Sequence, residues 1–235
     1  LAALGASRIL TYIAVVIGFA GLTGVLVFAA RADGGGRLAE TGDILRAGLM
    51  LGLVAGVALA FVLGGLAEPL LALFGVAPDL QRPGAAVVAA MAIAFPAQFL
   101  LAAASFFLEG ISRPQRVMAV NLAQLPLNAV LAWAWVGGHL GFPALGAVGA
   151  AYATATASWA GAMAMLAVVW MLPRAGERRV RDWSPAALKR AAARVPGLAW
   201  FGLVPAIGAC LELAGCAWLM VLSTRRGNEV AAAFQ

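Results

Sequence analysis

Long apolar stretches alternate with short polar ones along almost the whole chain. Six windows contain about twenty or more mainly apolar residues, the length that a helix needs to cross a hydrocarbon core of ~30 Å. They cover residues 9–30, 45–66, 85–108, 117–136, 147–172 and 198–222. No window carries Lys or Arg near its middle. The pattern therefore predicts an all-α integral membrane protein, a polytopic helical bundle.

Composition supports the same class of protein. Apolar residues make up 63% of the chain without counting glycine, and charged residues make up 11%. Soluble domains have roughly 45–50% apolar residues with glycine included, and about 25% charged residues. The net charge of +6 could suggest a nucleic-acid partner, but the basic residues lie between apolar windows and not on one soluble face. We therefore expect no nucleic-acid binding.

Positive charge is divided unevenly between the two sets of loops. Twelve of the sixteen Lys and Arg residues fall in alternate loops on one side. These twelve are Arg31, Arg37, Arg46, Arg113, Arg116, Arg174, Arg178, Arg179, Arg181, Lys189, Arg190 and Arg194. The positive-inside rule makes that side cytoplasmic, and we expect a multi-pass protein of the bacterial inner membrane.

One long polar segment, residues 173–195, separates the first five windows from the sixth. It is rich in basic residues, and residues 186–194 could form a short amphipathic helix. Anionic headgroups attract such segments by about 1 kcal/mol per charge, so we interpret it as a cytoplasmic linker on the membrane surface. A solvated connector is an equal alternative. The predicted domains are a first lobe over 1–172, this linker, and the start of a second lobe over 196–235.

Polar side chains inside a membrane span are informative because they are costly to place there. Asn121, Gln124 and Asn128 are spaced i, i+3 and i+7, so they share one helix face. Pro126 lies between them and frees a backbone carbonyl. The stripe is a candidate wall of a water-filled cavity, with hydrogen bonding between helices as the alternative. Gln98 is a weaker candidate of the same kind.

Glu212 lies near the middle of the sixth window, far from any other charged residue. A charge there costs about 2.5–3.5 kcal/mol. A carboxylate relieves this cost by binding a proton or by pairing with a cation, and an ion-coupled transporter needs such a group. A protonated carboxyl that only holds a neighbouring helix is the structural alternative.

No enzyme or metal-site pattern accompanies these residues. Cys210 and Cys216 fall in one apolar window, about 240° apart around a helix. We find neither paired His ligands, nor zinc spacing, nor a nucleophile or phosphate-binding motif. We expect no catalytic residue, no metal and no cofactor beyond a coupling H⁺ or Na⁺.

Three motifs resemble the multidrug and toxic compound extrusion (MATE) family. They are Glu109-Gly110-Ile111-Ser112-Arg113-Pro114, then Asn121…Gln124-Leu125-Pro126-Leu127-Asn128, then Gly141-Phe142-Pro143-Ala144-Leu145-Gly146-Ala147-Val148-Gly149-Ala150-Ala151-Tyr152-Ala153-Thr154. Gly197, Pro205 and Glu212 resemble the opening of the family's seventh span. The resemblance covers essentially the whole chain and aligns its six windows with family spans two to seven.

The resemblance implies an antiporter, not an enzyme, that exports small organic, often cationic, compounds by alternating access in exchange for H⁺ or Na⁺. Glu212 matches the coupling acid of the second lobe. Gln124 and Asn128 match a polar pair of the first lobe, with Gln124 where Asn is usual and Asn128 where some members have Asp. Thr154 roughly matches a polar position of the sixth family span. We expect membrane lipid around the protein, and a monomer when the protein is complete.

One departure from the family pattern bears on the mechanism. Many members carry a coupling acid on the first family span, which we expect to precede this chain. The chain starts with Leu1, and residues 229–235 look like the start of another helix, so we expect a piece of a longer protein. Glu109 lies too near the interface to replace that acid. Either the missing span supplies it, or coupling depends on Glu212 alone.

Two alternative functions stay open. A lipid-linked oligosaccharide or polysaccharide flippase of the related fold would carry cationic residues inside its cavity, and no window has one near its middle. A non-transporting membrane scaffold would give no reason for Glu212. It would explain the small residues that recur at four-residue spacing on one face of the fifth window, namely Gly146, Ala150, Thr154, Ser158 and Ala162.

Overall fold

The computed structural model describes the backbone of residues 2–73 and 76–225, with side chains at 11–73, 76–216 and 218. This part of the chain forms nine helices and no strand. The helices are α1 (Ala2–Gly21), α2 (Thr23–Gly34), α3 (Leu38–Gly65), α4 (Ala67–Leu73), α5 (Pro78–Ala92), α6 (Phe95–Gly110), α7 (Pro114–Gly137), α8 (Gly146–Trp170) and α9 (Pro185–Arg225). The prediction of an all-α membrane bundle is confirmed.

The helices correspond to the six apolar windows. Five are long and apolar enough to cross a membrane, and there are up to six if α5 and α6 form one broken span. These two helices meet at a 44° bend. Pro96 lies in the first turn of α6, where its missing N–H needs no partner. The bend therefore falls beside a proline, whereas Pro126 and Pro205 lie inside the continuous helices α7 and α9.

Three glycines of α3 allow it to pack closely against α2 and α6. A Cβ on Gly52 would lie 2.9 Å from the carbonyl oxygen of Phe99, and a Cβ on Gly56 would lie 2.7 Å from the Cα of Pro96. A Cβ on Gly48 would lie 2.7 Å from a methyl group of Val25. Small residues at four-residue spacing let helix backbones approach in membranes, where apolar contact itself gives little driving force. This ladder fixes α3 at the centre of the bundle.

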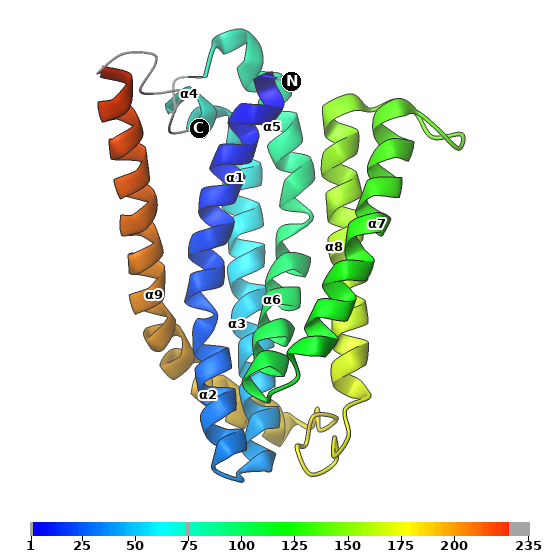
Figure 1. The fold of residues 1–235 in the computed structure, drawn as a ribbon, viewed down its shortest axis with the longest axis vertical. Coiled ribbons are helices and arrows are strands. Elements are labelled where there is room, and N and C mark those ends of the chain that lie inside the picture. Colours follow the sequence, from blue (N-terminus) through cyan, green and yellow to red (C-terminus); the bar gives the residue numbers. More distant parts are fainter. Residues whose placement is uncertain (1, 74–75, 226–235) are drawn as a thin grey trace.

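The other helices are arranged around α3 (Figure 1). The α7–α8 pair packs on one side through α6, and α9 packs on the other side against α1 and α3. The first part of α9 crosses the lower end of the bundle, and the rest rises beside α1 (Figure 1). The linker helix expected over 186–194 is thus continuous with the sixth span, because Pro196 lies inside α9 and does not end it. The start of a further helix expected at 229–235 lies outside the described residues.

Candidate functional site

The polar stripe of α7 reaches the interface between α7 and α8. Gln124 is half-buried, and its amide lies against Gly161 of α8. A Cβ at Gly161 would lie 2.6 Å from Gln124 Oε1, so the glycine makes room for the amide. Gln124 lines a cavity of about 470 Å³ between the two helices, whose other walls are mainly small apolar residues, with Arg116 among them. The cavity could accept an apolar molecule that also makes a hydrogen bond.

Asn121 lines a different pocket, of about 380 Å³. Its walls include Glu109, at the end of α6, and the apolar side chains of Met118 and Leu122. Positions i and i+3 differ by about 60° around a helix, which is enough for Asn121 and Gln124 to line separate spaces. The stripe is one face of α7, but the structure does not make it the wall of one cavity.

The other predicted first-lobe residues line neither of these two pockets. Asn128, Thr154 and Gln98 are half-buried. The Thr154 hydroxyl donates a hydrogen bond to the Ala150 carbonyl at 3.0 Å, within its own helix. A membrane helix often satisfies a Thr hydroxyl in this way, so Thr154 needs no ligand to complete its hydrogen bonding.

Glu212 belongs to α9, which lies on the opposite side of the bundle from α7 (Figure 1). α9 packs tightly against the end of α1 at Gly202, where an added Cβ would collide with the Gly21 carbonyl. Further along α9, Glu212 is exposed, and no hydrogen bond or ion pair involves it in the described part of the chain. The neighbouring Gly208 and Gly215 leave open space beside their Cα atoms. The described residues therefore do not bring Glu212 together with the α7 stripe.

A buried charged network at the lower end of the bundle has no counterpart in the sequence prediction. Arg46 is 0% exposed. Its Nη2 donates to Asp43 Oδ1 at 2.6 Å, and its Nη1 donates to the Arg179 carbonyl at 2.7 Å. The second oxygen of Asp43 accepts a hydrogen bond from Arg190 Nε at 3.3 Å. Asp43 therefore connects α3 to the beginning of α9, and Arg46 connects α3 to the linker.

Further ion pairs join α2, α3, the linker and the beginning of α9. Arg178 Nη1 lies 2.7 Å from Asp33 Oδ1, Arg190 Nη2 lies 3.4 Å from Asp182 Oδ2, and Arg194 Nη2 lies 3.7 Å from Glu40 Oε2. A Cβ at Gly42 would collide with the backbone of Arg178, so the linker rests directly on α3. Hydrogen bonds from the side chain and backbone of Ser184 hold the pKa of the exposed Asp182 carboxyl below its ordinary value.

This network explains why α3 begins at Leu38, seven residues before the predicted apolar window. Hydropathy left Asp43 outside the window and Arg46 at its edge, but a buried charge is tolerated when it is paired and hydrogen-bonded. The available signal was an acid and an arginine at i, i+3 where the window begins. In the sequence, Arg46, Arg178 and Arg190 indicated only the orientation in the membrane.

Comparison with known proteins identifies the family. The MatE family model matches residues 1–134, more than half of the chain. The chain belongs to the MATE family. The resemblance carried by the α6–α8 motifs is thereby confirmed, and the family is one of transporters, not of enzymes. As a MATE protein with five or six candidate spans, the chain is a multi-pass protein of the inner membrane.

Relatives named as multidrug resistance proteins match much of this MATE chain. It is 28% identical over 224 residues to "Multidrug resistance protein NorM" of Aliivibrio fischeri, covering 94% of this chain and 47% of the relative. It is 34% identical over 165 residues to "Probable multidrug resistance protein NorM" of Caulobacter vibrioides, covering 68% and 34%. It is 32% identical over 130 residues to "Multidrug resistance protein PmpM" of Pseudomonas aeruginosa, covering 55% and 27%. The chain thus spans about half, or less, of the length of these relatives.

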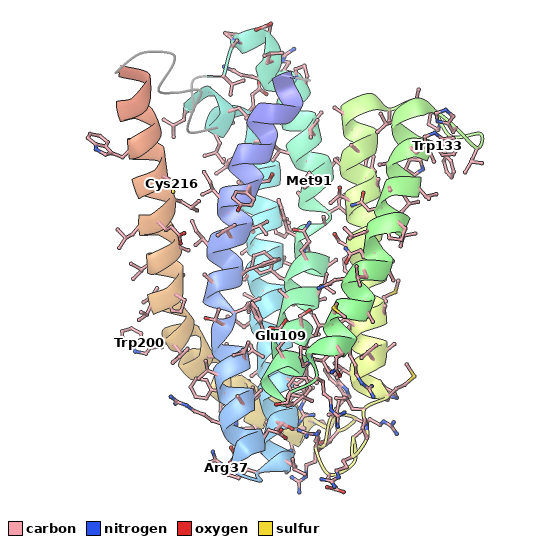
Figure 2. The ribbon with its side chains drawn as sticks, in the orientation of Figure 1. Arg37, Met91, Glu109, Trp133, Trp200 and Cys216 are labelled. Carbon is pink, nitrogen blue, oxygen red and sulfur yellow. The ribbon has the colours of Figure 1, made fainter. Side chains whose placement is uncertain are left out.

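A solved structure shares the MATE fold. The crystal structure of the eukaryotic MATE transporter AtDTX14 matches with a TM-score of 0.82 and 17% identity, over 94% of this chain and 48% of that protein. The likeness confirms that the helices form part of a MATE-like fold. The basic network lies at the same end as Arg37, opposite the end that carries Trp133 (Figure 2). By the positive-inside rule this MATE protein places that end in the cytoplasm.

Proposed function

We propose that this chain is part of an efflux antiporter that exports small organic compounds in exchange for H⁺ or Na⁺ by alternating access. The observation that carries the proposal is the family match over residues 1–134, together with relatives named for multidrug resistance. We infer the export of drugs, the antiport mechanism and the coupling ion for this chain from its membership in that family. The chemistry of its own residues supports them at two places.

Glu212 is the candidate ion-coupling residue. A carboxylate within an apolar helix costs about 2.5–3.5 kcal/mol at mid-membrane. Its side chain is exposed and has no hydrogen bond or ion pair in the described part of the chain, so nothing there offsets this cost. A proton or a sodium ion bound from a water-filled cavity would offset it. Glycines on both sides, Gly208 and Gly215, leave space around the carboxylate.

The α7–α8 cavity is the candidate place for substrate in the first lobe. It combines one amide, from Gln124, with small apolar walls from both helices. Such a lining makes few directional demands, so it suits compounds of varied shape. Asn121 with Glu109 would offer a second polar contact in the neighbouring pocket. We propose that substrate contacts Asn128, Thr154 and Gln98 only in another conformation of the transporter.

The test of coupling uses the complete gene with Glu212→Gln. Export driven by an imposed H⁺ or Na⁺ gradient should fall to the level of empty vesicles, while the amount of protein in the membrane stays unchanged. Glu212→Asp keeps a carboxylate and is the matched control, with export at least partly retained. Full export by Glu212→Gln at every pH and sodium concentration would refute the assignment.

The test of the cavity uses Gly161→Ala. The new methyl group would meet the Gln124 amide and push it into the cavity, so the apparent KM for large substrates should rise more than that for small ones. Gly176→Ala, in the linker with no atom near its Cβ position, is the control. An equal effect on all substrates, or none, would place the substrate elsewhere.

A further inference from the structure

An apolar groove runs along the outer surface of the cytoplasmic half of the bundle. It has a volume of about 350 Å³ and lies between α3, α8 and the linker, with one residue from α6. Leu45, Leu49 and Leu53 line it along one side of α3, a distance of about 12 Å at the rise of an α-helix. Leu53 is 43% exposed. The groove therefore opens sideways, at a depth where the surroundings are lipid chains.

Two tryptophans mark the cytoplasmic end of this groove. Trp170, the last residue of α8, and Trp183, in the linker, both line it and are both half-exposed. Tryptophan is enriched at the level of lipid headgroups because its ring is apolar and its N–H is polar. The groove thus extends from the apolar interior of the membrane to the level of the headgroups. A lipid molecule covers the same range of depth.

A fixed positive charge stands at the same end. The Nε and Nη2 atoms of Arg181 donate to the Trp170 carbonyl at 3.1 and 2.8 Å, and its guanidinium lies over the Trp170 ring, 5.8 Å from the centroid. Arg181 is nevertheless exposed. Arg46 forms part of the groove floor, and its buried Nε has no hydrogen-bond partner among the described residues. The apolar groove therefore ends beside the positively charged hydrogen-bond donors of Arg46 and Arg181.

The ion pairs of the linker show which sign of headgroup fits. Basic side chains already form ion pairs with four acidic residues, namely Asp33, Asp43, Asp182 and Glu40. Four linker cations have no acidic partner in the described part of the chain and are exposed, namely Arg174, Arg179, Arg181 and Lys189. This surplus charge favours an anionic headgroup over a zwitterionic one.

We propose that this groove is a binding site for one anionic phospholipid of the cytoplasmic leaflet. An acyl chain lies between α3 and α8 along Leu45–Leu53, and the phosphate lies beside Arg181 and Trp183. The lipid would fill the space between the linker and the span helices, so it would hold the linker on the bundle together with the Asp43–Arg46 pair. The inference does not depend on what the protein exports.

The experiment is native mass spectrometry of the complete purified transporter in detergent, titrated with phosphatidylglycerol or phosphatidylcholine of identical chains. One phosphatidylglycerol should bind about fivefold more tightly than phosphatidylcholine, the ratio expected for about one headgroup charge contact. Arg181→Gln should abolish the preference and leave phosphatidylcholine binding unchanged. Lys189→Gln removes the same charge from the same linker away from the groove and should keep the preference.

A second variant tests the groove itself. Leu53→Trp fills the end of the groove nearest the middle of the membrane. It should weaken the binding of the first lipid molecule, whether phosphatidylglycerol or phosphatidylcholine. Circular dichroism checks that the protein is folded, and Leu166→Phe, on the facing wall, replaces Leu53→Trp if that variant does not fold. Equal affinity of the wild type for both lipids would overturn the proposal. An equal loss of preference in Lys189→Gln and Arg181→Gln would also overturn it, because that result indicates diffuse surface charge. Unchanged lipid binding in the folded groove variant would overturn it as well.

Discussion

The buried pair of Asp43 and Arg46 makes the most direct prediction about stability. Arg46 is fully buried, and Asp43 is its only anionic partner in the described residues, at 2.6 Å. Removing one partner of a buried ion pair leaves an uncompensated charge and typically costs about 3–5 kcal/mol. Asp43→Asn keeps the shape and one acceptor oxygen, and the Arg179 carbonyl still accepts from Arg46. We therefore expect a loss at the lower end of this range, about 3 kcal/mol in the free energy of unfolding.

The matched control is Glu40→Gln, three residues earlier on the same helix. Glu40 pairs with Arg194 at 3.7 Å and with Arg37 at 3.8 Å, and all three side chains are at least one-third exposed. Solvent screens such pairs, and exposed pairs are worth about 0–1 kcal/mol. Glu40→Gln should therefore change the free energy of unfolding by less than about 1 kcal/mol.

The assay is unfolding in mixed micelles with increasing SDS, followed by far-UV circular dichroism. Trypsin cleavage after Arg178, Arg179 and Arg181 gives a second measurement, because undocking of the linker should expose these bonds several-fold faster in Asp43→Asn. Asp43→Leu combined with Arg46→Met removes both charges and should recover most of the lost stability. If Asp43→Asn costs no more than Glu40→Gln, or if the double variant is worse than the single one, the account of a compensated buried charge is wrong.

Two further predictions test local features. Gly56→Ala places a methyl group 2.7 Å from the Pro96 Cα and should destabilise the bundle by about 1–3 kcal/mol, whereas Gly65→Ala, with no neighbour near its Cβ position, should be neutral or slightly stabilising in the same SDS titration. The Asp182 carboxyl should titrate below its ordinary value of 3.8 in a carbon-13 NMR titration, and Ser184→Ala should raise that pKa. Since the folded-state pKa is lowered, the contribution of Asp182 to stability is complete above the ordinary value and is lost as pH falls through the lowered one; an unchanged titration in Ser184→Ala would contradict the hydrogen-bond cause.

The membrane architecture follows from hydropathy alone. An apolar run long enough to cross the hydrocarbon core must form a helix, because lipid offers no partner for backbone polar groups. All six windows therefore coincide with helices or helix pairs, and the α5–α6 bend falls beside Pro96. The motifs at 109–154 were specific enough to indicate the family, which the family match over residues 1–134 confirms. The domain division, the coupling role of Glu212 and the cavity roles of the α7 stripe stay predictions.

Tertiary structure decided what each helix face meets. Helical periodicity placed Asn121 and Gln124 on one face, but the neighbouring helices direct them into two pockets. Hydropathy began the second window at residue 45 and left Asp43 outside it, because a transfer scale assigns a cost to an isolated charge and does not include a partner such as Arg190, far away in sequence. Periodicity and hydropathy are local properties, whereas the pairing of a buried charge and the walls of a groove depend on segments that only folding brings together.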